Sequence, residues 1–364
     1  MTTEADRMKA QLTAKPHRKA WPKGSGLSTG ITTLNLGCSG SPHWAFPPGT
    51  FVLLVGKSKA GKSWLGRTIF AEACKNPYYA KHRLIDDDPE HGSLMDYRRF
   101  WGKTMAGRVE PPTERCSSRT LEECYANIVR ALKAGPCVYL VDSEDALYSQ
   151  DDAAKRAQNA RKAAKGQDGK GSYGTSKAKI NSASLPEVND LLARNGSILV
   201  MIKQSRDNIG FDAMFNPETR SGGRALTFYA SIELWFSIKG KIKRTVRGKP
   251  RVIGNKLHVT IKKNRVSGRD RHATFPFYPG SPHGIDDTGA MVDYLIDEDV
   301  WKVSKGEVVA PQFGGHAEAF VGSPDKLVRY IESEEREKEL RRLVVETWND
   351  IEAACEVQRK AKYL

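Results

Sequence analysis

Phe51-Val52-Leu53-Leu54-Val55 runs directly into Gly56-Lys57-Ser58-Lys59-Ala60-Gly61-Lys62-Ser63, and this junction sets the architecture of the chain. The first run has the length and composition of a buried strand. Glycines at both ends of the second run let the backbone turn tightly and aim successive N–H groups at phosphate oxygens. The pair predicts a strand followed by a phosphate-binding loop, and a glycine-rich surface turn is the alternative.

The residues after the loop complete the motif. Residues 64–73 carry apolar side chains at the spacing of a helix. A helix in this position points the positive end of its dipole at the same anion. The order strand, loop, helix therefore predicts a nucleotide site made by residues 56–63 and Trp64, with Lys62 at the terminal phosphates and Ser63 as a magnesium ligand.

Two further apolar runs end in acids. Asp142 follows the run Cys137 to Val141, at the place where phosphoryl-transfer proteins hold the carboxylate that serves magnesium, although such an Asp can also be only a helix cap. The run ending at Ile85 leads into Asp86-Asp87-Asp88-Pro89-Glu90-His91. Hydrolysis needs a carboxylate to orient or deprotonate the attacking water. Glu90 is our first candidate and Asp88 its competitor, and a solvated acidic turn is the alternative.

Strand-like runs alternate with helical patterns along most of the chain. These runs are Phe51 to Val55, Arg83 to Ile85, Val138 to Val141, Ile198 to Ile202, Ala230 to Ile238 and Leu257 to Ile261. The alternation predicts an α/β core over 27–299, with a mostly parallel sheet flanked by helices. We expect a short N-terminal arm over 1–26 for subunit contact and a small, mainly helical C-terminal domain over 300–364. The stretch 150–184 has few large apolar residues and is expected to be a mobile loop.

The composition is that of a folded domain without a membrane segment. The chain has 364 residues, of which 39% are hydrophobic and 28% charged. No run approaches the roughly 18 apolar residues of a membrane span, and the polar N-terminus lacks the apolar block of a signal peptide. We therefore expect a cytoplasmic protein with no membrane partner. The six cysteines form neither a metal pair nor a disulfide framework and are expected to be reduced thiols, mostly in packing roles.

The charge points to a polyanionic partner. The formal net charge is +15, which attracts polyanions and raises their rate of encounter. One segment with a single acid, Asp270, concentrates thirteen basic residues: Lys239, Lys241, Lys243, Arg244, Arg247, Lys249, Arg251, Lys256, Lys262, Lys263, Arg265, Arg269 and Arg271. This concentration favours a phosphate track on nucleic acid over a merely basic surface.

The segments 202–210 and 215–231 closely resemble the second DNA-binding loop of RecA recombinases. Four other segments are similar to motifs of the same family: Leu27 to Asn35 to its leading segment, Val141 to Leu147 to its magnesium strand, Lys263-Asn264-Arg265 to its subunit-interface motif, and Trp301 to Glu307 to the start of its C-terminal domain. The resemblance covers most of the chain and implies a RecA-like P-loop ATPase core. The unusual arm, insertion and tail favour a bacteriophage, UvsX-like member.

The loop also suits DNA on its own residues. Its glycines keep the backbone adaptable, its arginines offer phosphate contacts, and Ile209 is an apolar wedge that could enter a base stack. The expected DNA-binding residues of this loop are Arg206, Ile209, Gly210, Arg220, Ser221, Gly222, Gly223 and Arg224. The resemblance adds Tyr173 and Gly174, which lie in the stretch that takes the place of the family's first DNA loop.

The resemblance assigns further roles around the nucleotide. It implies that Gln204 senses the terminal phosphate and reports to the DNA loop, and that Tyr97 stacks on the adenine. Lys263 and Arg265 would reach ATP held by the adjacent subunit, and Phe228 would pack against that neighbour. Outside the family context, Lys263 and Arg265 fit a solvated strand edge, Phe228 an ordinary core position and Tyr97 a surface position.

The function that the resemblance implies is ATP-dependent DNA strand exchange. Its catalytic residues would be Lys62, Glu90 and Gln204, and its cofactors ATP and Mg²⁺. The implied partners are single-stranded DNA, double-stranded DNA and further copies of the chain in a helical filament, with single-strand-binding and loader proteins as additional candidates. Two alternatives keep the same core: a hexameric DNA helicase, and a non-catalytic recombination mediator.

Overall fold

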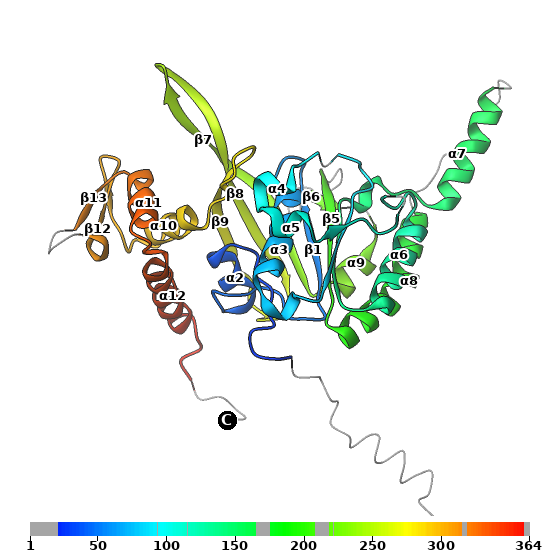
Figure 1. The fold of residues 1–364 in the computed structure, drawn as a ribbon, viewed down its shortest axis with the longest axis horizontal. Helices are drawn as coiled ribbons and strands as arrows, with labels where there is room; N and C mark the ends of the chain where they lie inside the picture. Colours follow the sequence, from blue (N-terminus) through cyan, green and yellow to red (C-terminus); the bar gives the residue numbers. More distant parts are fainter. Residues whose placement is uncertain are drawn as a thin grey trace, which may run out of the picture.

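The computed structural model describes residues 21–92, 94–114, 116–164, 175–207, 218–220, 222–314 and 319–359. A large sheet in the order β10-β9-β8-β7-β1-β5-β4-β2-β3 runs through it, and β6 pairs with β5 beside this path. The strands are β1 (Phe51–Gly56), β2 (Arg83–Asp87), β3 (Val109–Glu110), β4 (Cys137–Val141), β5 (Ile198–Asp207), β6 (Glu218–Arg220), β7 (Ile232–Val246), β8 (Lys249–Asn264), β9 (His272–Tyr278) and β10 (Gly284–Ile285). Helices flank this sheet (Figure 1).

The part of the sheet that carries the nucleotide motif is parallel. Strands β7, β1, β5, β4, β2 and β3 pair in parallel, whereas β8, β9 and β10 continue from β7 in antiparallel pairs. The predicted α/β fold with a mostly parallel central sheet is confirmed. Because parallel strands end at the same edge, the carboxyl ends of β1, β2, β4 and β5 meet, and Gly56 is the register partner of Gln204.

Helices cover both faces of the sheet, and one of them, α7 (Gln150–Ala163), projects away from it (Figure 1). They are α2 (Thr32–Ser39), α3 (Lys62–Lys75), α4 (Tyr97–Trp101), α5 (Lys103–Ala106), α6 (Leu121–Ala134), α7 (Gln150–Ala163), α8 (Thr175–Asn195) and α9 (Arg224–Tyr229). Alternate residues of β1 point to opposite faces: Val52 and Leu54 join a buried cluster with α2 and α3, while Phe51, Leu53 and Val55 join one with α6, α8 and α9. Both faces of β1 are thus buried, as its continuous apolar sequence predicts.

The expectation of a mobile loop over 150–184 is wrong for the residues described. Residues 150–163 form α7, and 175–184 form the start of α8. Ser149 caps α7 by accepting a hydrogen bond from the backbone N–H of Asp152, and acids in its first turn with bases in its last turn suit the helix dipole. Alanine-rich sequence favours a helix even without large apolar residues, so a low content of core formers did not mean a loop.

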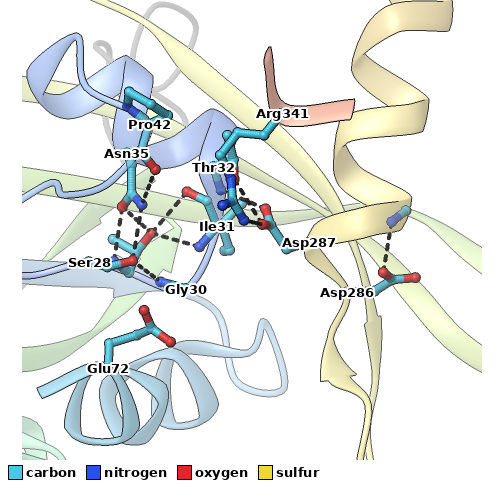
Figure 2. Close-up of polar contacts among 12 residues, drawn as sticks. Ser28, Gly30, Ile31, Thr32, Asn35, Pro42, Glu72, Asp286, Asp287 and Arg341 are labelled. Carbon is cyan, nitrogen blue, oxygen red and sulfur yellow. Dashed lines mark hydrogen bonds and ion pairs between the residues drawn. The ribbon is translucent and has the colours of Figure 1, made fainter. Parts of the chain in front are cut away.

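The leading segment, residues 27–35, connects α2 to Asp287, near the end of the core. Asn35 Oδ1 accepts hydrogen bonds from Thr29 N at 2.9 Å and Thr29 Oγ1 at 2.8 Å, which folds the segment back on α2. The backbone N–H of Thr32 donates to Asp287 Oδ1 at 2.6 Å, and Arg341 lies 3.5 Å from Asp287 Oδ2 (Figure 2). Burial raises the pKa of Asp287, and its hydrogen bonds from Thr32 oppose that shift.

The C-terminal elements, apart from their exposed first strand, contribute to a third buried cluster with α10 (Asp287–Asp297). They are β11 (Val303–Ser304), β12 (Glu307–Ala310), β13 (Phe320–Gly322), α11 (Pro324–Ser333) and α12 (Glu337–Ala354). The three strands form a small sheet of their own, and the elements lie to one side of the large sheet (Figure 1). Among the described residues, no helix is long and apolar enough to cross a membrane. All six cysteines are free thiols, and Cys38, Cys124 and Cys137 are buried.

Candidate nucleotide site and nucleic-acid face

The loop between β1 and α3 has the backbone that its glycines predict. Gly61 adopts φ +81°, a left-handed conformation that favours glycine. A Cβ on Gly56 would lie 2.5 Å from the carbonyl oxygen of Phe236, so a side chain there would collide with backbone. Lys62 Nζ donates to the carbonyl oxygens of Gly56 and Lys57, at 2.8 Å each. The lysine is therefore held over the loop, where a phosphate would meet it.

A cavity of about 530 Å³ opens beside this loop. This volume suits a small ligand. Its wall combines loop residues 58–63 and Trp64 with Glu90, Asp142 and Gln204 from three other strand ends. Burial lowers the pKa of Lys62, and the neighbouring Asp142, Glu90 and Asp145 oppose that shift. Residues that are far apart in sequence thus form one polar site at the carboxyl edge of the sheet.

Glu90 is bound from two sides within this cavity. Ser143 Oγ donates a hydrogen bond to Glu90 Oε1, and Gln204 Nε2 donates to the same oxygen at 3.3 Å. Asp88, the competing acid, does not line the cavity, and its backbone N–H donates to Ser117 Oγ at 3.1 Å. The geometry therefore favours Glu90 over Asp88 as the acid that faces a ligand. Sequence reasoning did not single out Ser143, although it directly follows Asp142.

A buried arginine stands behind the two acidic strand ends. Arg67 is fully buried and lies 2.6 Å from Asp142 Oδ2 and 3.1 Å from Asp86 Oδ2. Burial raises the pKa of Asp86, and Arg67 opposes that shift. Sequence reasoning missed Arg67. The available signal was a charged residue one turn after Ser63, near the apolar residues Trp64 and Phe70 of the same helix.

Tyr97 takes part in the same buried group. Its hydroxyl donates to Asp86 and accepts from Arg67 Nε at 3.3 Å, and burial raises its pKa to about 12. Tyr97 does not line the cavity, whereas Phe100 does, with its ring centroid 4.9 Å from that of Trp64. The adenine-stacking role of Tyr97 stays a prediction.

A cluster of buried charged residues includes Lys203, the residue before Gln204. Lys203 and Glu144 are both fully buried and form an ion pair, and Lys203 Nζ also lies 3.0 Å from Asp145 Oδ1. The other oxygen of Asp145 accepts from the backbone N–H of Gln204 at 2.7 Å. Asp145 therefore fixes the backbone from which Gln204 reaches Glu90. Sequence analysis did not predict this cluster, because Glu144 and Lys203 are far apart in sequence.

The cluster continues to the expected DNA loop. Asn181 Nδ2 donates to Glu144 Oε1 at 3.2 Å and to the carbonyl oxygen of Gly222 at 2.9 Å. Lys177 Nζ donates to the carbonyl oxygens of Glu144 and Asp145, at 3.1 Å each. Side chains of α8 therefore connect the Gln204 end of the nucleotide cavity to Gly222.

The described part of the expected DNA loop is open to solvent. Arg206 and Arg224 are exposed. Gly222 and Gly223 have φ of +97° and +79°, and Gly223 directly precedes α9. Arg220 belongs to β6, which pairs with β5. The other predicted DNA residues, Tyr173, Gly174, Ile209, Gly210 and Ser221, lie outside the described residues.

The three predicted interface residues meet at the end of α9. Lys263 Nζ donates to the carbonyl oxygens of Thr227 and Phe228, and an Arg265 guanidinium nitrogen donates to that of Phe228 at 2.8 Å. The guanidinium carbon of Arg265 lies 5.8 Å from the centroid of the Phe228 ring. Phe228 is 63% exposed, which is unusual for an aromatic side chain. The structure thus presents two cations and one apolar ring together on the surface.

Comparisons with known proteins find that this chain is similar to RecA proteins. The family model described as the RecA N-terminal domain matches residues 154–281. Protein RecA of Chlorobium limicola is 29% identical over 76% of this chain and 71% of its own length, and Protein RecA of Mycobacterium avium is 27% identical over 93% of each chain. Protein RecA of Thioalkalivibrio sulfidiphilus is 28% identical over 86% of this chain and 84% of its own length.

Both comparisons find this chain similar to RecA proteins. The family match includes β5, β6, α9 and the β7–β8 hairpin, which together carry Gln204, the expected DNA loop and the Lys263–Arg265 pair. The phosphate-binding loop and Glu90 lie before the matched residues. The alignment with the Mycobacterium avium RecA covers 93% of this chain, so the similarity is not confined to the matched domain.

Proposed function

We propose that this protein is an ATP-dependent recombinase that forms helical filaments on single-stranded DNA and exchanges DNA strands. One observation carries the proposal: Gln204 contacts Glu90 in the nucleotide cavity and lies on β5, three residues before that strand ends and leads into the expected DNA loop. A single side chain thus touches the candidate catalytic acid and begins the segment expected to bind DNA. A phosphate-binding loop alone would fit many nucleotide enzymes.

The donors around the cavity suit a magnesium nucleotide. Mg²⁺ prefers oxygen ligands, and the Ser63 hydroxyl and the Asp142 carboxylate both line the cavity beside the loop. The Arg67 contact leaves the second oxygen of Asp142 for such a role, so the residues fit the ion. Bound Mg²⁺ would neutralise developing phosphate charge. Lys62 holds the terminal phosphates, and Glu90 orients and deprotonates the attacking water.

Hydrolysis would change the contacts at Gln204. While the terminal phosphate is present, the Gln204 amide can donate to it, and after phosphate release it returns to Glu90. Asp145 holds the backbone of Gln204, and the chain of contacts through Lys203, Glu144 and Asn181 ends at Gly222. A movement of the Gln204 side chain can therefore be transmitted through these contacts toward the expected DNA loop. ATP turnover would recycle the filament rather than drive base pairing.

The protein would bind the DNA backbone, and base pairing between the strands would recognise the sequence. Exposed Arg206 and Arg224 supply phosphate contacts, and glycine-rich backbone lets the loop adapt to a strand. Lys263 and Arg265, beside the exposed Phe228, form the surface that meets the ATP of a neighbouring subunit. ATP at that junction would stabilise the contact between consecutive subunits.

Residues 27–299 would form the ATPase and DNA-binding core, 1–26 an arm for subunit contact and 300–364 a small C-terminal domain. The protein would act in the cytoplasm, as a bacteriophage, UvsX-like member of the family. Single-strand-binding and loader proteins would be additional partners. No observation favours the helicase or mediator alternatives over this function.

A joint-molecule assay tests the proposal. Wild-type protein, ATP, Mg²⁺ and a single-stranded oligonucleotide should form displacement loops in a homologous supercoiled plasmid, and Lys62→Ala should not. A heterologous oligonucleotide is the matched control for base pairing. ATP hydrolysis with unwinding of forked DNA but no joint molecules would indicate the helicase alternative, and nucleotide binding without either activity would indicate the mediator.

A further inference from the structure

Arg67 is a buried charged residue whose role the proposed function leaves open. It lies on α3, one helical turn after Ser63, and its side chain is fully buried. A long side chain on a helix points back toward the helix N-terminus, which places the guanidinium beside the phosphate-binding loop. Burying an arginine is costly unless its donors find acceptors, so its contacts indicate what the residue does there.

One nitrogen of Arg67 contacts both residues expected to hold magnesium. Nη1 donates to Asp142 Oδ2 at 2.6 Å and to the backbone carbonyl oxygen of Ser63 at 3.2 Å. Ser63 belongs to the first turn of α3, whereas Asp142 directly follows β4. Arg67 therefore joins two expected ligands that come from different elements. It engages one oxygen of Asp142 and leaves the other for the ion.

The rest of the guanidinium is held by Asp86 and Tyr97. Nε lies 3.1 Å from Asp86 Oδ2, and Nη2 donates to Asp86 Oδ1 at 3.3 Å, so this ion pair has two contacts. The Tyr97 hydroxyl donates to Asp86 and accepts from Arg67 Nε at 3.3 Å. Asp86 and Asp142 are only 7% and 6% exposed, so water competes little for these contacts. Two carboxylates and a hydroxyl thus fix the plane of the guanidinium.

We propose that Arg67, held by Asp86 and Tyr97, is a positioning residue for the magnesium site, which fixes Ser63 and Asp142 relative to each other and thereby sets the affinity for the ion. The inference rests on the proposed function, because it takes Ser63 and Asp142 as the magnesium ligands. Residues that hydrogen-bond to metal ligands orient them, and their replacement typically costs about 10–100-fold in metal affinity or activity. Arg67 itself does not line the cavity and acts through the ligands.

The proposal gives the hydroxyl of Tyr97 a role of its own. Stacking on adenine would use the face of the ring, whereas support of Arg67 uses only the hydroxyl group. Burial raises the pKa of Tyr97 to about 12, so the hydroxyl keeps its proton at neutral pH and can donate to Asp86. Tyr97→Phe removes this link and keeps the ring, so this variant separates the two roles.

The test measures how much Mg²⁺ strengthens nucleotide binding. A fluorescent, nonhydrolysable ATP analogue is titrated with each protein in EDTA and again in excess Mg²⁺. The ratio of the two dissociation constants gives the gain in affinity that is due to the ion. Because the analogue is not hydrolysed, this ratio does not depend on activity. A variant that only loses stability changes both dissociation constants alike and leaves the ratio as it was.

Arg67→Lys is the main variant, because it keeps the charge but an ammonium group cannot span several acceptors as a planar guanidinium does. Tyr97→Phe is the milder variant, and it decides the test if circular dichroism shows that Arg67→Lys does not fold. Arg83→Lys makes the same exchange in an exposed ion pair with Glu110 and is the matched control.

Arg67→Lys should lower the gain from Mg²⁺ by about tenfold or more, and its affinity for the analogue in EDTA should stay close to that of the wild type. Tyr97→Phe should lower the gain by a smaller factor, and Arg83→Lys should leave it unchanged. A wild-type gain in every Arg67 and Tyr97 variant that folds would overturn the proposal, as would equal weakening with and without Mg²⁺. The magnesium site of the proposed function would fail separately, if the wild-type protein itself bound the analogue equally well with and without Mg²⁺.

Discussion

Gln204 Nε2 lies 3.3 Å from Glu90 Oε1, so the carboxyl-terminal part of β5 and the turn after β2 meet inside the nucleotide cavity. Ser143, after β4, binds the same oxygen. Three strand ends thus converge on one carboxylate, which is what a parallel sheet allows and a local motif cannot produce. Because Gln204 also leads into the expected DNA loop, this contact is the most informative single relationship in the structure.

Glu90→Gln should slow ATP hydrolysis strongly while leaving ATP binding unchanged. The amide keeps the shape of the side chain but cannot accept a proton, and loss of a general base typically slows a reaction by about 10²–10⁴-fold. Asp88→Asn is the matched control and should hydrolyse ATP at close to the wild-type rate, since Asp88 does not line the cavity. Single-turnover hydrolysis of radiolabelled ATP measures both. The opposite ranking of the two variants would assign the role to Asp88.

Gln204→Ala should uncouple ATP hydrolysis from DNA. The variant keeps the loop, Lys62 and Glu90, so slow DNA-independent hydrolysis should remain, while the stimulation by single-stranded DNA should disappear. Asp145→Asn should reduce the stimulation less, because the amide oxygen can still accept from the Gln204 backbone at the observed 2.7 Å contact. Steady-state ATPase rates with and without oligo-dT give the ratio. Full stimulation in Gln204→Ala would contradict the sensor role.

Glu144→Gln should destabilise the fold by about 2–3 kcal/mol, because a buried charge that loses its partner is costly. Lys203 would keep its contact with Asp145 Oδ1 at 3.0 Å. The control is Glu187→Gln, which breaks the exposed pair with Lys133 and should change stability by less than about 1 kcal/mol. Urea unfolding followed by circular dichroism measures both. Equal changes in the two variants would mean that the buried cluster adds nothing to stability.

As pH rises, ATP affinity should begin to fall at a lower pH than it would if Lys62 had the usual lysine pKa of 10.5. Burial lowers the pKa of Lys62 below the usual 10.5, so the ammonium loses its proton at a lower pH and phosphate binding weakens as pH rises through that value. In the nucleotide-free protein, the contribution of Lys62 to the free energy of unfolding changes with pH in the opposite direction. The unfolded chain holds the proton longer, so Lys62 makes folding more favourable as pH rises toward 10.5.

Calorimetric titration with ATP between pH 7 and pH 10 checks the binding side of this prediction. Lys62→Arg is the matched variant, because a guanidinium stays charged over the whole range. Whatever affinity that variant has should vary little with pH. A wild-type affinity that is equally flat would show that Lys62 keeps an ordinary pKa or does not contact the phosphates.

The sequence predicted what depends on local pattern. The strand, loop and helix around Gly56 to Lys62 follow from glycine positions and apolar spacing, and the parallel order of strands then brings Glu90, Asp142 and Gln204 together. The buried pairs were not predictable in this way. Arg67 and Lys203 look like surface residues until the fold places an acid beside each of them.

Predictions that rested on amino-acid composition were less accurate than those that rested on motifs. Residues 150–163 were expected to be a loop because they lack large apolar side chains, yet their alanines and a Ser149 cap give a helix. The basic segment was expected to be one phosphate track, but Lys256, Arg269 and Arg271 are paired with acids. Which charges remain free depends on acids from α10 and α12, far along the chain.

Imaging of filaments tests the central claim most directly. Purified protein is mixed with long single-stranded DNA and a nonhydrolysable ATP analogue and examined by negative-stain electron microscopy, with Lys62→Ala as the control. We predict continuous helical filaments for the wild type and none for Lys62→Ala. Protein that stays monomeric on the DNA, or that forms closed rings, would contradict the account.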